Sequence, residues 1–406
     1  MSAPTSSRRH DIDALRAIAF GLLILYHVGM FYVPWGWHVK SEHIVPWLQT
    51  PMMVLNQWRM PLVFLISGLA VNFLLGEGDK QRMGYGAFAW LRVKRLLVPL
   101  AFGMLLIVPP QAYFEALANG ATEPGYLAFL WHYFTFQGWP EGAFAGTDPG
   151  ITWNHLWYLP YLLFYTLVLA LLLSVFGRPI AALRGAFRRL RGLSLVLVPV
   201  ALLMPIGIWI FPLFPYINHD LLTDAYAHAM YGTFFLYGYL LGRDPGLWME
   251  MARLRWVTLP LAASAFVLLR GMSEIAPAGD DEAFNTAVTF VIYLNRWSWL
   301  MLVLGWGHHW LNRPMAWLNY ANRAVYPWYV LHQTIIVVAG VWLSGLGLGP
   351  VMEPVVLVLV TVGGCAGGMY VVERWVPWLG AGIGLKIGRQ QWIPGRVASK
   401  LIRQEL

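Results

Sequence analysis

The chain has 406 residues, of which 58% are hydrophobic and only 12% are charged. Because a soluble domain carries about 25% charged residues, this composition excludes an ordinary soluble protein and indicates a membrane protein with several spans. The formal net charge of +8 is divided among separate short loops, which argues against a nucleic-acid-binding surface and predicts no nucleic-acid partner.

Apolar stretches of about 20 residues, the length that spans a bilayer, recur along the chain. We predict an all-α polytopic membrane protein with about ten transmembrane helices. Residues 1–376 are expected to form one transmembrane domain, and residues 377–406 a basic cytoplasmic tail. A shorter apolar stretch at 125–137 is expected at the membrane interface. The predicted spans are 12–33, 55–76, 93–111, 154–176, 193–213, 226–242, 256–270, 286–306, 323–344 and 353–372.

Positive charge alternates between successive loops of this predicted topology. Arginine and lysine gather before the first span, after each even-numbered span and in the tail, whereas the loops between carry mainly acidic residues. By the positive-inside rule, both termini are expected in the cytoplasm. Arg8 and Arg9 precede the first apolar run as in a signal peptide, but no small-residue cleavage site follows. We therefore expect the run to be retained as the first helix.

The first predicted span carries three ionisable side chains, Asp13, Arg16 and His27. Such groups cost roughly 2.5–3.5 kcal/mol each near the centre of a span. Arg16 and His27 are about three helical turns apart, so all three side chains are predicted on one stripe facing a polar path. A purely structural alternative makes Asp13 and Arg16 a boundary ion pair and His27 a hydrogen-bonded residue between helices.

Four motifs follow one another along the chain: LRAIAFGLLILYH (residues 15–27), RMPLVFLISG (residues 59–68), RVKR (residues 92–95) and AVYPWYVLHQTII (residues 324–336). They resemble the signatures of membrane acyltransferase family 3, whose members are bacterial O-acyltransferases of periplasmic and cell-surface sugars. The resemblance covers nearly the whole chain. It implies a multi-pass enzyme of the bacterial inner membrane.

Two further stretches are similar to one subgroup of that family. They are WGWHVKSEH (residues 35–43) and WNHLWYLPYLL (residues 153–163), the latter with His-Leu-Trp where many relatives have Trp-Ser-Leu and a glutamate. The subgroup is implied to succinylate osmoregulated periplasmic glucans. The resemblance therefore implies acyl-coenzyme A, expected to be succinyl-coenzyme A, as the donor and a periplasmic glucan or related polysaccharide as the acceptor. No bound cofactor is expected, and a homo-oligomer in the lipid bilayer is left open.

His27 is the residue best suited to the chemistry that this resemblance implies. An unperturbed histidine has a pKa of about 6.5 and can take a proton from a hydroxyl group at neutral pH. His27 is therefore the expected general base. The alternative is a covalent acyl-histidine intermediate. Arg16 is expected to stabilise developing negative charge, and Asp13 to orient Arg16.

The remaining arginines of interest have two interpretations each. Arg92 and Arg95 are expected to bind the phosphates of acyl-coenzyme A, although positive-inside topology alone also explains them. Arg59 is predicted at the outer start of the second span, where that rule gives no reason for it, and it is expected to receive an anionic acyl group or to pair with Glu42. Gly68, after Ser67, is expected to allow close helix packing.

The acceptor is expected on the outer side, where aromatic rings suit the apolar faces of sugars. An interfacial aromatic belt is the alternative for most of these rings. His332 is as readily a packed histidine as a catalytic one. With Cys365 as the single cysteine, no metal site is expected. The expected acceptor-site or acyl-group-binding residues outside the arginines are His38, Asn154, His155, Trp157 and His332.

Two rival functions remain at this point. An acetyltransferase of a surface polysaccharide would share the same family motifs but would not need Arg59. A transporter or flippase for a sugar or a lipid-linked intermediate would also need a polar path through the membrane. The absence of a visible internal repeat argues against the transporter.

Overall fold

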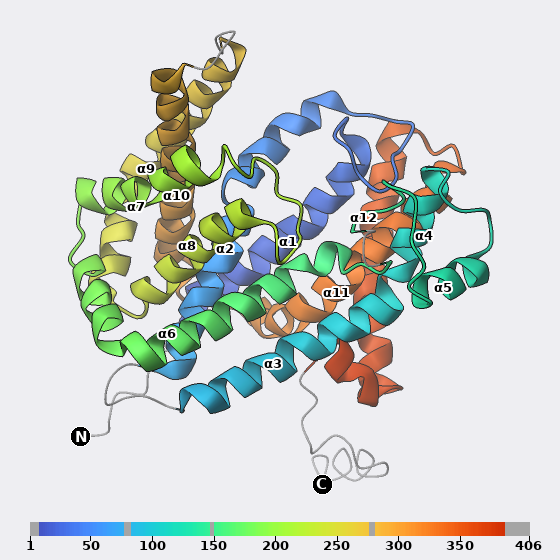
Figure 1. Cartoon of the computed structure of the whole chain (residues 1–406), viewed down its shortest axis with the longest axis horizontal. Coiled ribbons are helices and arrows are strands. Elements are labelled where there is room, and N and C mark those ends of the chain that lie inside the picture. The colour runs from blue at the N-terminus through green and yellow to red at the C-terminus, as the bar shows by residue number, and fades with distance from the viewer. Residues whose placement is uncertain (1–7, 77–82, 147–149, 276–280, 386–406) are drawn as a thin grey trace.

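The computed structural model describes residues 8–76, 83–146, 150–275 and 281–385. All regular secondary structure in these residues is helical, as predicted (Figure 1). The longer helices are α1 (His10–Tyr32), α2 (Gln49–Leu75), α3 (Tyr85–Phe102), α6 (Tyr158–Phe187), α7 (Leu193–Pro205), α8 (Ala225–Leu241), α9 (Pro245–Glu274), α10 (Glu282–Leu311), α11 (Ala316–Ser344) and α12 (Gly349–Arg374). The shorter ones include α4 (Pro109–Ala118), α5 (Tyr126–Phe134), η4 (Asn154–Trp157) and η6 (Pro377–Ile383).

Eight helical segments of the described chain are long and apolar enough to cross a membrane. Each of the ten predicted spans falls on a helix, but α3 and α8 are less suited to spanning. α8 has 17 residues, and the 18 residues of α3 include Arg92, Lys94 and Arg95. The 125–137 stretch forms the nine-residue α5, which packs on α4. The prediction of an all-α polytopic membrane protein is confirmed; most of the predicted tail, residues 386–406, lies outside the described residues.

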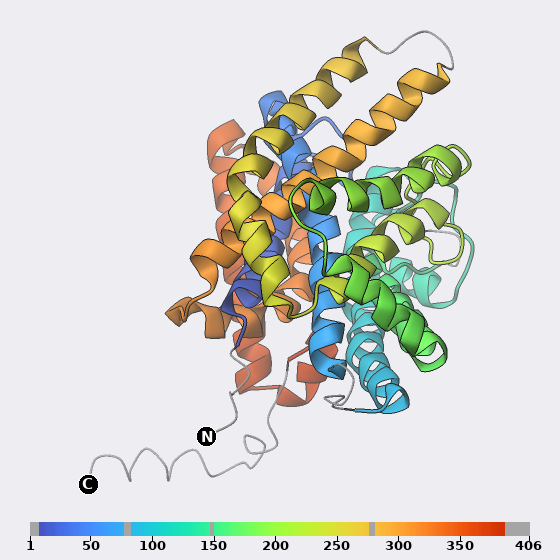
Figure 2. The ribbon, with the colours of Figure 1, turned by 90° about the vertical axis from the view of Figure 1, so that its left-hand side faces the viewer.

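The helix α1 contacts α2, α10, α11 and α12 and so lies within the bundle (Figure 1). The first turns of α1 and α3 and the last turn of α12 lie at one end of the molecule (Figure 2). We call this the basic end, because the arginines Arg16, Arg92 and Arg95 belong to it. The start of α11 lies there too, since Arg8 Nη1 donates a hydrogen bond to Asn319 Oδ1 at 3.2 Å.

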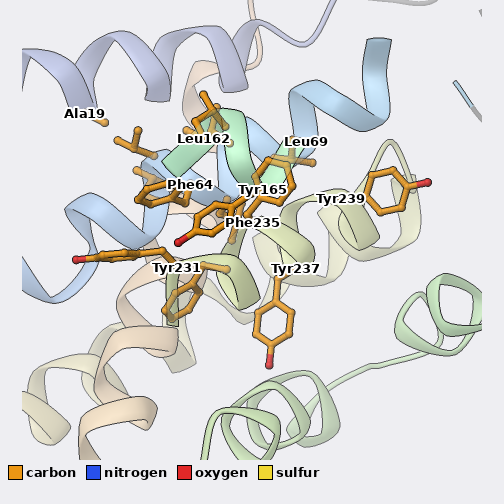
Figure 3. Packing of buried hydrophobic residues seen from close by; sticks show 14 of the residues in the cluster. Ala19, Phe64, Leu69, Leu162, Tyr165, Tyr231, Phe235, Tyr237 and Tyr239 are labelled. Atoms are coloured by element: carbon orange, nitrogen blue, oxygen red, sulfur yellow. The ribbon is translucent and has the colours of Figure 1, made fainter. Parts of the chain in front are cut away.

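The contact between α2 and α8 is unusually close. A Cβ atom added to Gly68 would lie 1.8 Å from the backbone oxygen of Phe235, and one added to Gly238 would lie 1.8 Å from that of Leu65. The predicted role of Gly68 in close helix packing is confirmed. Aromatic rings fill the surrounding core (Figure 3), where the rings of Phe64 and Tyr231 stack at 4.8 Å.

The second span begins earlier than the sequence predicts. α2 starts at Gln49, whereas the predicted span starts at residue 55. A 3-10 turn with Pro46 at its start precedes the helix and continues directly into it. Arg59 therefore lies well inside the helix and not at its outer boundary, and it is buried with 6% of its surface exposed.

Candidate active site

A cavity of about 970 Å³ lies between the helices. Its walls come from α1, α2, α4, α6, α8, α10, α11 and η4, and its remaining lining comes from Met104 and the connecting segments around residues 36–38, 145–146, 151–153 and 217–220. The cavity brings together residues from distant parts of the chain. The predicted site residues that line it are His27, His38, Arg59, Asn154, His155 and Trp157.

His27 on α1 and His332 on α11 form a hydrogen-bonded pair in which the proton positions follow from the backbone. His332 Nδ1 lies 2.8 Å from the carbonyl oxygen of Tyr329 and 3.1 Å from that of Trp328, so it must carry the proton. Nε2 of neutral His332 is then an acceptor, and His27 Nδ1 donates to it at 2.8 Å. The lone pair of His27 therefore resides on Nε2. No hydrogen bond among the described residues uses that atom, so it remains free on the cavity wall.

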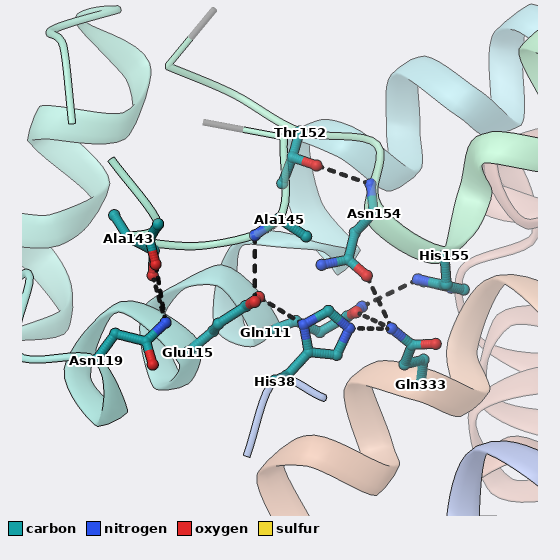
Figure 4. A network of polar contacts seen from close by, with 11 residues as sticks. His38, Gln111, Glu115, Asn119, Ala143, Ala145, Thr152, Asn154, His155 and Gln333 are labelled. Atoms are coloured by element: carbon teal, nitrogen blue, oxygen red, sulfur yellow. Dashed lines mark hydrogen bonds and ion pairs between the residues drawn. The ribbon is translucent and has the colours of Figure 1, made fainter. Parts of the chain in front are cut away.

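A buried amide network lies beside this pair (Figure 4). Gln333, the residue after His332, donates from Nε2 to Asn154 Oδ1 and to His38 Nε2, both at 2.8 Å. Gln111 on α4 donates from its own Nε2 to His155 Nδ1 at 3.3 Å. Gln333 and Gln111 are 2% and 0% exposed. The network therefore fixes the orientation of three predicted acceptor-site residues.

His38 is held by an acidic residue as well as by an amide. Its Nδ1 donates to Glu115 Oε2 at 2.5 Å, and Glu115 Oε1 accepts a hydrogen bond from the backbone of Ala145 at 3.2 Å. Since both ring nitrogens of His38 are occupied, this histidine shapes the cavity wall and is not a free base.

Two guanidinium groups on the cavity wall have no acidic partner within the described residues. In the described part of the chain, Arg59 makes one long hydrogen bond, to Asn56 at 3.5 Å, and its Nε and Nη1 atoms have no partner. Its Cζ lies 3.6 Å from the centre of the Tyr26 ring, a cation–π contact. Arg296 on α10 donates to the Tyr226 hydroxyl group at 3.2 Å. Both arginines line the cavity, as do Asp220 and Glu115, whose carboxylate binds His38. The two guanidinium groups therefore offer local positive charge to an anion.

The basic end is separate from the cavity that contains His27. Asp13 accepts from Arg8 at 2.9 Å and, as predicted, from Arg16, at 3.4 Å. Arg16 also donates to Asn322 at 2.8 Å. Arg92 is buried, and Arg95 lies one helical turn later on α3. The structure therefore does not bring these four predicted residues into direct contact with His27.

Three aromatic rings lie at the boundary between the basic end and the cavity. The ring of Phe20 is 5.5 Å from that of Tyr329 and 6.3 Å from that of Tyr158, and all three side chains line the cavity. The Tyr158 hydroxyl group interacts electrostatically with both Arg16 and Arg92. We call Phe20, Tyr158 and Tyr329 the aromatic layer.

An aromatic and histidine pair occupies another part of the cavity wall. The rings of Trp157 and His219 stack with their centres 4.2 Å apart, and the indole nitrogen of Trp153 donates to the backbone oxygen of His219 at 3.1 Å. Burial lowers the pKa of His219 to about 4, so the stacked ring is neutral at neutral pH. Flat, uncharged ring faces of this kind suit the apolar face of a sugar.

Several residues of the cavity wall are not among those predicted from the sequence. Gln333 lies within the motif at residues 324–336, and Arg296 is a charged residue inside an apolar span. Both features are visible in the sequence and could have indicated a role at the site. Gln111 and His219 carried none, because their roles depend on tertiary contacts.

The chain is similar to known proteins over most of its length. Residues 9–372 match the family model described as Acyltransferase domain. The chain is 24% identical over 361 residues to Glucans biosynthesis protein C of Escherichia coli (strain SMS-3-5 / SECEC), which covers 85% of this chain and 86% of that protein. Proteins of the same name from Escherichia coli (strain K12) and Shigella dysenteriae serotype 1 (strain Sd197) match with the same identity and coverage. No solved structure matches the chain.

Proposed function

The chain belongs to the Acyltransferase domain family, and we propose that it moves a succinyl group from succinyl-coenzyme A to hydroxyl groups of a periplasmic glucan. Family membership makes it a membrane acyltransferase that transfers groups other than aminoacyl groups. The glucan acceptor is taken from the likeness to Glucans biosynthesis protein C. The observation that carries the proposal is the free Nε2 atom of His27 on the wall of a large cavity.

His27 acts as the general base in the proposed reaction. A sugar hydroxyl group in the cavity gives its proton to His27 Nε2, and the hydroxyl oxygen attacks the thioester carbonyl carbon. When the carbon–sulfur bond breaks, the same proton passes from His27 to the departing sulfur, which leaves as the thiol of coenzyme A. His332 holds the ring in the required tautomer, because its Nε2 accepts from His27 Nδ1 at 2.8 Å.

In this proposal the protein lies in the bacterial inner membrane with its basic end facing the cytoplasm, and the donor binds from that end. The buried Nε atoms of Arg16 and Arg92 have no hydrogen-bond partner among the described residues, and together with Arg95 these arginines offer positive charge to the phosphates of coenzyme A. The pantetheine arm then has to pass the aromatic layer to bring the thioester to His27. The glucan enters from the periplasmic side.

The two guanidinium groups that have no carboxylate partner in the described residues favour succinyl over acetyl. A succinyl group carries a terminal carboxylate, which Arg59 and Arg296 would neutralise, whereas an acetyl group leaves both guanidinium groups uncompensated. A buried charge without a partner is costly, and a substrate carboxylate removes that cost. Arg59 and Arg296 are therefore the proposed acyl-group-binding residues.

Replacing His27 tests the proposed function directly. We expect His27→Ala to lower transfer from radiolabelled succinyl-coenzyme A to purified periplasmic glucan by about 100-fold or more, because a positioned base typically contributes that much. His309→Ala is the matched control, since His309 is an exposed histidine at the end of α10 outside the cavity. A His27→Ala protein that is folded and fully active would contradict the assignment of the base. A wild-type protein that transfers no label would favour a transporter or flippase.

A further inference from the structure

Asn154 combines two unusual features on the cavity wall. Its φ angle is +45°, in the left-handed region that few residues other than glycine adopt. Its side chain is 8% exposed, yet Nδ2 has no hydrogen-bond partner in the described chain. Asparagine tolerates positive φ better than most residues, so the backbone alone implies no function. A buried amide donor without an acceptor does need an explanation.

The network around Asn154 determines which end of its amide faces the cavity. His155 Nε2 must donate to the backbone oxygen of Val330, which lies 3.1 Å away, so His155 Nδ1 accepts from Gln111 Nε2. The Gln111 oxygen therefore faces Gln333, and Gln333 presents its Nε2 in return at 3.2 Å. That Nε2 donates to Asn154 Oδ1 at 2.8 Å.

Two fixed points anchor this order of donors and acceptors. One is the backbone oxygen of Val330; the other is that of Ile107, which accepts from the Thr334 hydroxyl group at 2.6 Å and so leaves the Thr334 oxygen to accept from Gln111 at 2.5 Å. Because both anchors are carbonyl groups, the amide of Asn154 cannot reverse without breaking the network. Nδ2 is left pointing away from Gln333 (Figure 4).

Asn154 lies close to the proposed base. Gln333, which holds it, follows His332 directly in α11, and the ring of neighbouring His155 is 5.2 Å from that of His332. His332 in turn binds His27. Asn154 and His27 line the same cavity. A substrate bound in this cavity can therefore lie against both residues.

We propose that Nδ2 of Asn154 donates a hydrogen bond to the oxyanion of the tetrahedral intermediate, an inference that rests on the proposed function. The sugar oxygen bonds to the thioester carbon while its proton goes to His27, and the carbonyl electron pair moves onto oxygen, where Nδ2 meets it. Collapse restores the C=O bond, breaks the C–S bond and returns the proton to sulfur. A donor fixed before the reaction needs no reorganisation when the charge develops.

Kinetics of Asn154→Gly test this role, because glycine suits the positive φ and removes only the side chain. With radiolabelled succinyl-coenzyme A and purified periplasmic glucan, we expect kcat to fall about 100-fold or more, as for loss of one oxyanion donor, with KM for both substrates nearly unchanged. Asn119→Ala is the control, since Asn119 Nδ2 donates to Gly142 and Ala143 outside the cavity. The control should keep the wild-type kcat.

The outcomes separate this inference from its alternatives. A raised KM for glucan with kcat retained would overturn it and make Asn154 an acceptor-binding residue, and unchanged kinetics in an active enzyme would overturn it alone. A wild-type protein without transfer would overturn the proposed function and this inference together. If Asn154→Gly does not fold, Asn154→Asp keeps the shape but replaces the donor with a carboxylate oxygen, and it should lower kcat at least as much; retained kcat would again overturn the role.

Discussion

Arg59 is the residue whose chemistry is least explained by folding alone. An ammonium or guanidinium group removed from water normally pairs with a carboxylate. In the residues that the structure describes, Arg59 instead makes a cation–π contact with the Tyr26 ring and one hydrogen bond, to Asn56. It interacts electrostatically with both His27 and His332. The charge is thus placed beside the proposed reaction centre, where the carboxylate of the proposed succinyl group would pair with it.

We expect Arg59→Met to reverse acyl selectivity. Losing one charge-assisted hydrogen bond to a substrate carboxylate costs about 1.5–3 kcal/mol, which lowers kcat/KM for succinyl-coenzyme A by about 10- to 100-fold and leaves acetyl-coenzyme A unaffected. The two donors can be compared in one competition assay. Arg270→Met, at an exposed arginine paired with Glu274, is the control. An Arg59→Met enzyme that keeps its preference for succinyl would show that the carboxylate binds elsewhere.

At the scale of helices, the contact between α2 and α8 positions Arg59 and Tyr231 on the same cavity wall. The backbones approach closely because Gly68 and Gly238 face each other's helix without side chains. Small residues allow this approach in membrane proteins, where lipid supplies no hydrophobic drive for helices to associate.

We expect Gly238→Ala to destabilise the protein by about 1–3 kcal/mol, the usual cost of overpacking. The added Cβ would lie 1.8 Å from the Leu65 backbone oxygen, which no side-chain rotation can relieve. Gly363→Ala on α12 is the control, because a Cβ there meets nothing within 4 Å. Thermal melting in detergent should show a lower Tm for Gly238→Ala only. An equal or higher Tm would mean that the two helices separate without cost.

The positions of the helices could be predicted from the sequence better than the contacts between them. Apolar run lengths placed a helix at every predicted span, since a bilayer-crossing segment needs only length and composition. The predicted start of the second span, residue 55, was wrong. The polar and aromatic residues near Gln49 are helical but are not typical of a membrane span. Asn154 could be proposed as a site residue from its motif. Its contact with Gln333 could not be predicted, because that contact depends on how α11 packs.

At the scale of the whole molecule, the cavity and the basic end occupy different parts of the helical bundle. Asp11, fully buried near the start of α1, accepts hydrogen bonds from Arg9 at 2.6 Å and from His308 at 2.8 Å, which fixes the end of α10 at the basic end. The aromatic layer divides this end from the cavity. In the proposed reaction, donor and acceptor approach from opposite faces of the membrane, which requires a single orientation of the chain.

Cysteine labelling tests that orientation. Cys365 is fully buried, so the wild-type protein should give little background with a membrane-impermeant maleimide. Glu42 and Arg313 are exposed residues in loops on opposite sides of the predicted topology. Since the positive-inside rule retains arginine-rich loops in the cytoplasm, Glu42→Cys should react in intact spheroplasts and Arg313→Cys only after permeabilisation. The reverse pattern would place the basic end outside the cell, where coenzyme A is absent, and the proposed direction of acyl transfer would then be wrong.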